Sequence, residues 1–183
     1  MPRIPYPDPA TLSEAMRRTV LANQSNVTRM LARASEPVFN GFAALSMAFM
    51  KGSPLPARLR EIAILRVGYL SNAAYEVFQH EALARHVGLS DAEIAAIKSG
   101  GAAAKTLGDA GAAVLAYADD LVKNVRASDA TLAAIRKHLD DIQVVDLTLV
   151  TGMYMMVSRF LETTGIEIDA QPIDWKAVTP AKS

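Results

Sequence analysis

The sequence predicts an all-α fold, and three observations support that prediction. Alanine is abundant, alternation of β-branched residues is absent, and turn signals recur at helix-length intervals. The chain has 183 residues, a length that suits one domain and is short for two domains of ordinary size. We find no internal repeat and no low-complexity tract. We therefore expect residues 1–183 to form a single helical domain.

Capping and turn residues place the helices in order along the chain. Thr11-Leu-Ser-Glu14 and Ser90-Asp-Ala-Glu93 are capping-box patterns, each of which opens a helix. Pro56 fits the first turn of a helix, and Gly100-Gly101 ends another. The predicted helices cover about residues 11–22, 37–50, 56–70, 72–87, 90–99, 109–123, 129–139 and 142–163. The tail over residues 165–183 is predicted to be irregular and to pack on a neighbour.

The composition limits both the partners and the chemistry. Lysine and arginine together number 19, as do aspartate and glutamate, so we expect no nucleic-acid or membrane partner. The absence of cysteine removes disulfides, thiolate nucleophiles, cysteine-based zinc sites and thiol redox chemistry. The longest charge-free apolar stretches, residues 38–50 and 147–158, are shorter than the roughly 18 to 20 residues of a membrane span.

The apolar content predicts contacts between subunits. Hydrophobic residues make up 51% of the chain, and subunit contacts explain this excess better than lipid does. We therefore expect a homo-oligomer with its interface on the final helix and on the tail around the only tryptophan, Trp175. The amino terminus lacks the charged-then-apolar pattern of a signal peptide, so we expect a cytoplasmic protein.

The predicted helix over residues 72–87 carries a candidate catalytic pair. At roughly 100° per residue, Glu76 and His80 lie within the apolar arc, whereas Gln79 lies on the opposite face. Because burying either group unpaired is costly, they should pair with each other or with a third group. Such a pair holds a histidine in one tautomer for general acid–base catalysis. If Asn72 caps the helix, the positive helix end favours the ionised form of Glu76.

The preceding helix supplies a third member of the site. Residues 61–70 are apolar nearly all round, and only Glu61 and Arg66 carry charge there. We therefore predict a catalytic set of Glu61, Glu76 and His80. Two plainer interpretations stay open, namely a surface ion pair worth under about 1 kcal/mol and a pair of metal ligands that still needs a third. We predict neither a metal nor a cofactor.

Other polar residues occur within apolar helices. Arg66, Tyr154 and Arg159 could each anchor a substrate carboxylate or cap a neighbouring helix. Gly100-Gly101 and Gly108 fit no phosphate loop, because no strand precedes them and no Gly-Lys-Ser/Thr follows. The sequence has no Gly-x-Ser-x-Gly motif and therefore gives no support to a serine hydrolase.

Three segments together give the chain a family resemblance. They are Leu59-Arg-Glu-Ile-Ala-Ile-Leu-Arg-Val-Gly-Tyr-Leu70, Tyr75-Glu-Val-Phe-Gln-His80 and Gly88-Leu-Ser-Asp-Ala-Glu-Ile94. With them the chain resembles the carboxymuconolactone decarboxylase family, whose superfamily includes the alkylhydroperoxidase D proteins. Residues 150–161 are similar to the family's final helix. The resemblance is strongest over about residues 55–100 and implies an alkylhydroperoxidase D-like helical bundle that assembles into dimers, trimers or hexamers.

The resemblance also distinguishes peroxidase from decarboxylase chemistry. In the peroxidase branch, a glutamate precedes a Cys-x-x-Cys-x-x-x-His segment whose cysteines reduce the hydroperoxide. Here the glutamate corresponds to Glu61 and the histidine to His80, but Ala73 and Glu76 occupy the cysteine positions. Thiol peroxidation by that mechanism is therefore impossible in this chain. The lactone decarboxylase branch resembles Glu-x-x-x-His, which Glu76 and His80 match.

The resemblance implies a lyase that uses acid–base chemistry on a small carboxylated lactone or a related ring-cleavage product of aromatic catabolism. Decarboxylation needs a proton delivered to carbon as carbon dioxide leaves, and His80 suits that role. Glu76 and Glu61 would then set the charge of His80. The alternative is a non-catalytic helical oligomer that uses the same pocket to bind a small ligand.

Overall fold

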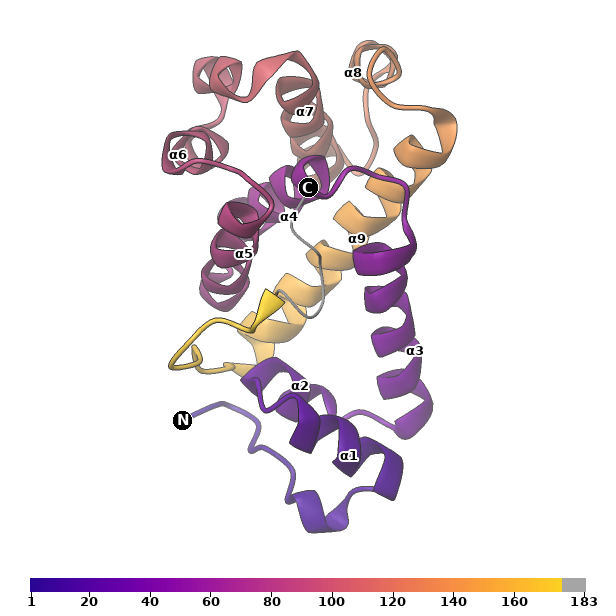
Figure 1. Cartoon of the computed structure of the whole chain (residues 1–183), viewed down its shortest axis with the longest axis vertical. Helices are drawn as coiled ribbons and strands as arrows, with labels where there is room; N and C mark the ends of the chain where they lie inside the picture. Colours follow the sequence, from indigo (N-terminus) through magenta and orange to yellow (C-terminus); the bar gives the residue numbers. More distant parts are fainter. Residues whose placement is uncertain (176–183) are drawn as a thin grey trace.

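The computed structural model describes residues 1–175 and is all-helical, as predicted (Figure 1). These described residues form nine α-helices and no strand. The helices are α1 (Glu14–Ala22), α2 (Asn26–Leu31), α3 (Glu36–Met47), α4 (Ala57–Leu70), α5 (Ala74–His86), α6 (Asp91–Ser99), α7 (Gly108–Asn124), α8 (Asp129–Ile135) and α9 (Asp141–Thr164). Of the predicted irregular tail, residues 176–183 lie outside the described part of the chain.

Helix α4 forms the centre of the fold because its sequence is apolar on nearly every side. Ile62, Ile64 and Leu65 have 0% of their surface exposed. The helix packs against α5, α6, α7 and α9. Burying each such side chain contributes roughly 1.5–3 kcal/mol. A helix without a polar stripe is stable in water only when other helices surround it, so its few charged residues, including Glu61, are carried into the interior.

Helices α1, α2 and α3 form a second layer around a smaller apolar cluster. The cluster consists of Met16, Val20, Ala32 and Phe39. Figure 1 shows this layer on the other side of α9 from α6 and α7. Helix α2 was not predicted, although its N-cap Ser25 has the expected chemistry and accepts a hydrogen bond from the backbone N–H of Thr28.

Two predicted helices end earlier than expected. Helix α3 stops at Met47, and the chain continues as one π-helical turn over Ala48–Gly52. Helix α8 stops at Ile135, four residues before the predicted end. The π-helical turn carries Met50 into the interior, where it reaches the cavity described below. Single π turns within helical segments are frequent at functional sites.

The segment after α9 packs on its own chain. The Asp169 carboxylate accepts hydrogen bonds from Tyr75 Oη (2.5 Å) and Gln79 Nε2 (2.8 Å), both in α5. It also accepts one from the backbone N–H of Asn26 in α2 (2.9 Å). Trp175 Nε1 donates to the carbonyl oxygen of Gln79 (3.1 Å). The described part of the tail therefore packs on α5 of its own chain and buries Gln79, which was predicted to face outward. Contact of the tail with a neighbouring subunit stays a prediction.

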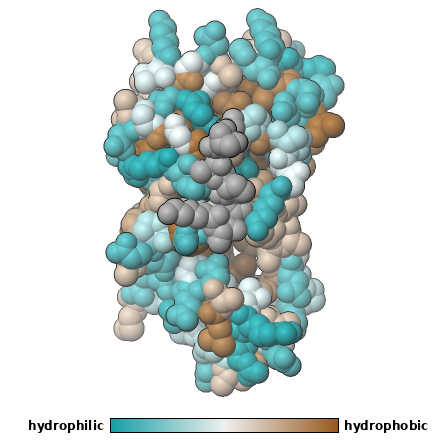
Figure 2. Space-filling view, in the orientation of Figure 1, coloured by the Kyte–Doolittle hydropathy of each residue, from teal (hydrophilic) through white to brown (hydrophobic). Residues whose placement is uncertain are grey.

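Helix α9 leaves an apolar stripe exposed. The exposed side chains are Ile142, Val145, Leu149 and Met156, whose spacing of three, four and seven residues puts them on one face. The helix is long and apolar enough to cross a membrane, but half of its most apolar window is buried inside the protein. Figure 2 shows hydrophobic and hydrophilic residues interspersed over the face in view. Homo-oligomer formation stays a prediction, and this stripe is where we expect the contact.

Arg66 ties α4 to α6 and α7. Its Nη1 donates to the carbonyl oxygens of Ile97 (2.9 Å) and Lys98 (3.0 Å) in the last turn of α6. Its guanidinium also forms an ion pair with Asp119 of α7. These contacts match the helix-capping alternative for Arg66, because they satisfy carbonyl groups that the helix end leaves unpaired. Gly100, which follows α6, lies directly against the guanidinium.

Gly100→Ala should destabilise the fold more than Gly101→Ala. Both glycines have positive φ, 65° and 57°, and Gly100, with ψ of −161°, lies in a region that essentially only glycine adopts, at a cost of roughly 1–3 kcal/mol for other residues. At Gly100 a Cβ would also lie 2.5 Å from Arg66 Nη2, whereas at Gly101 it would meet nothing within 4 Å. Urea unfolding should therefore show an additional loss of about 1 kcal/mol or more for Gly100→Ala. Equal losses in the two variants would contradict this account of the Arg66 contacts.

Candidate functional site

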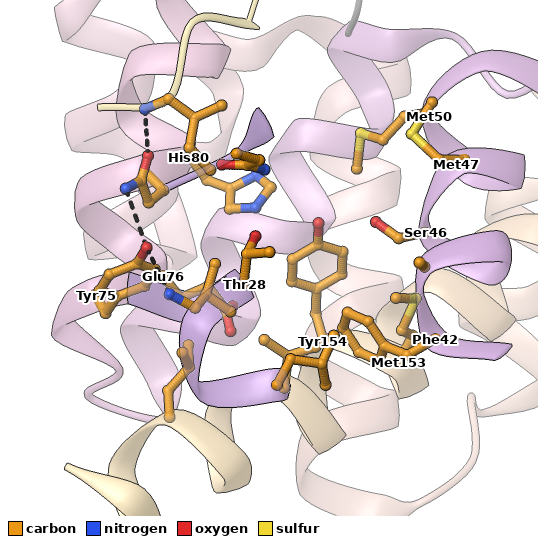
Figure 3. Close-up of a pocket in the computed structure, with 18 of the residues that line it drawn as sticks. Thr28, Phe42, Ser46, Met47, Met50, Tyr75, Glu76, His80, Met153 and Tyr154 are labelled. Atoms are coloured by element: carbon orange, nitrogen blue, oxygen red, sulfur yellow. Dashed lines mark hydrogen bonds between the residues drawn. The ribbon is translucent and has the colours of Figure 1, made fainter. Parts of the chain in front are cut away.

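A cavity of about 280 Å³ lies between the two layers of helices. It is bounded by α1, α2, α3, α5, α9 and the C-terminal segment. Figure 3 shows His80 and Tyr154 beside this space, with Met47 and Met50 on the opposite wall. The volume is close to the lower end of the range for small-molecule pockets, roughly 300–1,000 Å³.

Glu61 holds His80 across the interface between α4 and α5. His80 Nδ1 lies 2.7 Å from Glu61 Oε2, and both side chains are buried. Because a carboxylate accepts hydrogen bonds and donates none, the proton of this bond belongs on Nδ1. The lone pair of the neutral ring is then on Nε2, at its other edge. Nε2 has no hydrogen-bond partner among residues 1–175, and His80 lines the cavity.

Arg60 supplies the counter-charge for Glu61. Its Nε donates to Glu61 Oε1 (3.2 Å), and its Nη1 donates to the carbonyl oxygen of Phe49 (2.9 Å). Arg60 is only 2% exposed, so its positive charge acts in a desolvated environment. Sequence analysis missed Arg60, because residues adjacent on a helix do not usually face each other.

Aromatic rings fix the orientation of the imidazole. The ring of Tyr154 meets His80 edge-on, with the centroids 4.8 Å apart. The ring of Trp175 lies at a tilt, 5.5 Å away between centroids. With Nδ1 bonded to Glu61, these contacts restrict the ring to one orientation, as a proton carrier requires.

Glu76 pairs with Ser158 of α9 instead of with His80. Ser158 Oγ donates to Glu76 Oε2 (2.7 Å), and no hydrogen bond joins Glu76 to His80 in the described residues. Burial raises the pKa of Glu76 to about 8, and the charges of Glu162 and Glu61 add to the rise while the Ser158 hydrogen bond opposes it. The carboxyl group is therefore mostly protonated at neutral pH. The position of Glu76 in the first turn of α5 had favoured the ionised form, but desolvation is the larger effect.

Of the three residues expected to bind substrate, Tyr154 alone lines the cavity. Burial raises the pKa of its hydroxyl well above the usual value, and nearby carboxylates act in the same direction. Arg66 caps α6 outside the cavity, as described above. Arg159 is exposed, and its Nη1 donates to the carbonyl oxygen of Met155 in its own helix (2.6 Å).

Gln79 connects the site to the C-terminal segment. Its Oε1 accepts a hydrogen bond from the backbone N–H of Ile173 (2.8 Å), 94 residues further along the chain. Together with the bond from Trp175 to the Gln79 carbonyl, this contact holds the indole against His80. No local pattern in the sequence predicts this closure, because it depends on where a distant irregular segment returns to α5.

The cavity wall carries little charge. Among its described residues Glu76 is the one carboxylic acid, and none is lysine or arginine. Residues 1–175 contain no group of three histidine, aspartate or glutamate side chains placed to hold a metal ion. The chemistry that these side chains can support is proton transfer through His80 in a mostly apolar space.

The raised pKa of Glu76 should make stability fall as pH rises. Between its usual value of 4.5 and about 8, the folded protein holds a proton that the unfolded chain has released. Raising the pH through this window therefore favours unfolding, by up to about 1.4 kcal/mol per pH unit. Urea unfolding at pH 6 and pH 8 should show this loss in the wild type and much less of it in Glu76→Gln.

Glu81→Gln is the matched control for that measurement. Glu81 lies on the same helix but is partly exposed and accepts hydrogen bonds from Tyr69 and Arg85 outside the cavity. It should keep the wild-type pH dependence. If Glu76→Gln and the wild type lose the same stability between the two pH values, the claim that the buried carboxyl group of Glu76 is protonated is refuted.

The comparisons with known sequences give one family. The sequence model of the Carboxymuconolactone decarboxylase family matches residues 36–120. This segment includes Glu61, Glu76 and His80 and ends within α7. Comparison with curated protein sequences gives no match.

Solved structures share the fold. An uncharacterised peroxidase-related protein from Ralstonia eutropha JMP134, described as an alkylhydroperoxidase AhpD core, has a TM-score of 0.79 at 22% identity, covering 92% of this chain and 93% of that one. A peroxidase-related protein from Silicibacter sp. TM1040 has a TM-score of 0.75 at 18% identity, covering 92% of each chain.

A protein of unknown function from Agrobacterium tumefaciens, provisionally assigned to antioxidant defence as AhpD, has a TM-score of 0.68 at 23% identity. The match covers 76% of this chain and 96% of that one. At these identities the likeness concerns the fold alone. The chain therefore carries a carboxymuconolactone decarboxylase family segment over residues 36–120, within an AhpD-like helical fold that has no cysteine.

Proposed function

We propose that this protein is an enzyme that uses cofactor-independent acid–base chemistry on a small molecule, in a reaction of the decarboxylase type. The buried Glu61–His80 hydrogen bond beside the cavity carries this proposal, because it leaves Nε2 as the available proton-transfer atom. The substrate class is a carboxylated lactone or a related ring-cleavage product, which the family segment suggests.

The reaction follows from the position of His80. The bond between the substrate carbon and its carboxylate breaks, and the electron pair moves onto a conjugated carbonyl group as carbon dioxide leaves. His80, protonated on both nitrogens, delivers the Nε2 proton to carbon and becomes neutral. Glu61 stabilises the charged form of the ring before the transfer and keeps Nδ1 protonated after it. Solvent then restores the proton on Nε2.

The apolar walls support the decarboxylase type. A carboxylate that enters the cavity loses water and finds no lysine or arginine among the described lining residues. The same charge is dispersed as neutral carbon dioxide forms, so desolvation favours the transition state over the bound carboxylate. A protonated Glu76 adds no negative charge to this space.

The structural neighbours include proteins named as peroxidase-related, but this chain lacks the thiols for that chemistry. Ala73 and Glu76 occupy the positions of the two cysteines, and the whole sequence contains none. Any peroxidase activity would need a reductant other than a cysteine of this chain.

The test is carbon dioxide release from two lactones. One is γ-carboxymuconolactone, which carries two carboxylates, and the other has an isobutyl group in place of the acetate arm. His80→Gln should lower kcat/KM by about a hundredfold or more, the usual contribution of a positioned acid or base. Glu61→Gln should lower it as well, because the ring loses its charged partner.

His138→Gln is the matched control, since His138 is exposed on the chain after α8 and lies outside the cavity. It should retain full activity, and circular dichroism should confirm that all three variants are folded. Release of carbon dioxide at an unchanged rate in His80→Gln would refute the role of His80. A wild type that binds these lactones without releasing carbon dioxide would favour the non-catalytic ligand-binding protein.

A further inference from the structure

We infer that the ligand places one oxygen at Tyr154 Oη, turns its reacting carbon toward His80 Nε2, and carries no charge except the carboxylate that is lost. This inference names the substrate class of the proposed decarboxylase site and therefore rests on that proposal. Three features of the cavity support it, namely a pair of unpartnered polar atoms, walls that are mostly apolar and without lysine or arginine among the described lining residues, and the positions of the arginines.

Tyr154 and His80 form the polar end of the cavity. They come from α9 and α5, and their rings are in edge contact with the centroids 4.8 Å apart. Figure 3 shows the Tyr154 hydroxyl directed into the space beside the imidazole. Neither this hydroxyl nor His80 Nε2 has a hydrogen-bond partner within the described residues. Because burial keeps the phenol protonated, Tyr154 is a hydrogen-bond donor to a ligand oxygen at neutral pH.

The remaining wall suits an apolar body. The side chains facing the polar end include Phe42, Met47, Met50, Met153, Val157 and Leu161. Methionine thioethers adapt to irregular apolar shapes, so such a wall can accept an alkyl or ring substituent. The lining also includes the uncharged polar residues Thr19, Asn23, Thr28 and Ser46, but among its described residues no lysine or arginine, so it offers a second charge on the ligand no counter-ion.

The nearby arginines already bind other groups of the protein, so a second negative charge on the ligand would have no counter-ion. Arg60 is bonded to Glu61 and to a backbone carbonyl, and Arg66 binds Asp119. Burying an unpaired carboxylate costs several kcal/mol. For the carboxylate that leaves, this desolvation cost disappears as neutral carbon dioxide forms. A carboxylate that stays on the product remains buried without a counter-ion.

Tyr154 also has a role in the proposed decarboxylation. As the bond to the carboxylate breaks, its electron pair moves through the conjugated system to the carbonyl oxygen. The Tyr154 O–H donates a hydrogen bond to that oxygen and stabilises its growing negative charge. His80 Nε2–H then protonates carbon and the carbonyl re-forms, so one carboxylate and one proton give one C–H bond and carbon dioxide.

Binding of γ-octalactone, an uncharged lactone with a butyl arm, tests the polar end. Trp175 is the only tryptophan and lines the cavity, so its fluorescence reports binding in the full chain. Tyr154→Phe should weaken binding by about tenfold, the effect of one lost hydrogen bond. Tyr117→Phe is the matched control, because the Tyr117 hydroxyl is bonded to Thr148 outside the cavity, and it should leave binding unchanged.

The same lactone with a carboxylate at the end of its butyl arm tests the charge limit. It should bind the wild type at least about a hundredfold more weakly than γ-octalactone, because the added charge is buried without a partner. This comparison uses the wild type alone and so does not depend on how any variant folds. Equal binding of the two lactones, or full binding by Tyr154→Phe, would overturn the inferred ligand class.

The two carbon dioxide assays separate this inference from the proposed reaction. If the isobutyl lactone and γ-carboxymuconolactone react with the same kcat/KM, the ligand class is wrong while the decarboxylase proposal stands. If γ-octalactone binds as predicted and neither carboxylated lactone reacts, the ligand class stands and the decarboxylase proposal fails. A preference of at least about tenfold for the isobutyl lactone supports both.

Discussion

The hydrogen bond between Glu61 and His80 is the interaction on which the rest of the site depends. It crosses from α4 to α5 inside the apolar interior, where either group alone would cost several kcal/mol. Arg60 completes the arrangement by placing a positive charge against the other oxygen of Glu61. Each of these buried groups therefore requires its neighbour. A protein that only needed a stable core would gain as much from apolar residues at these positions.

The surroundings keep all other charge away from His80 Nε2. Glu76 is neutralised by burial, and the walls supplied by α3, α9 and the C-terminal segment are mostly apolar. In this space His80 Nε2 and the Tyr154 hydroxyl lie side by side, and the other polar groups among the described lining residues, such as Thr28 and Ser46, carry no charge. The sequence contains no cysteine, so this site has no thiol of its own chain to use.

Helical periodicity was sufficient to predict that Glu76 and His80 face the interior, because burial on a helix repeats every 3.6 residues. Glu61 lies in a helix that is apolar nearly all round, so the sequence left open whether it was buried or at a solvated helix end, and the packing around α4 buries it. It could not decide which carboxylate bonds to His80, since that choice depends on how closely α4 and α9 approach α5. Gln79 shows a second limit of predicting burial from helical periodicity. Its face of α5 is covered by a segment more than 90 residues away, so no local pattern could predict its burial.

Nitrogen NMR of the His80 ring is the measurement that tests the central claim most directly. At a pH where the ring is neutral, we predict a protonated Nδ1 with the strongly deshielded proton of a hydrogen bond to a carboxylate, and a bare Nε2. In Glu61→Gln that proton signal should lose its deshielding. A neutral ring that carries its proton on Nε2, with Nδ1 bare, would contradict the assignment of Nε2 as the nitrogen that faces the substrate.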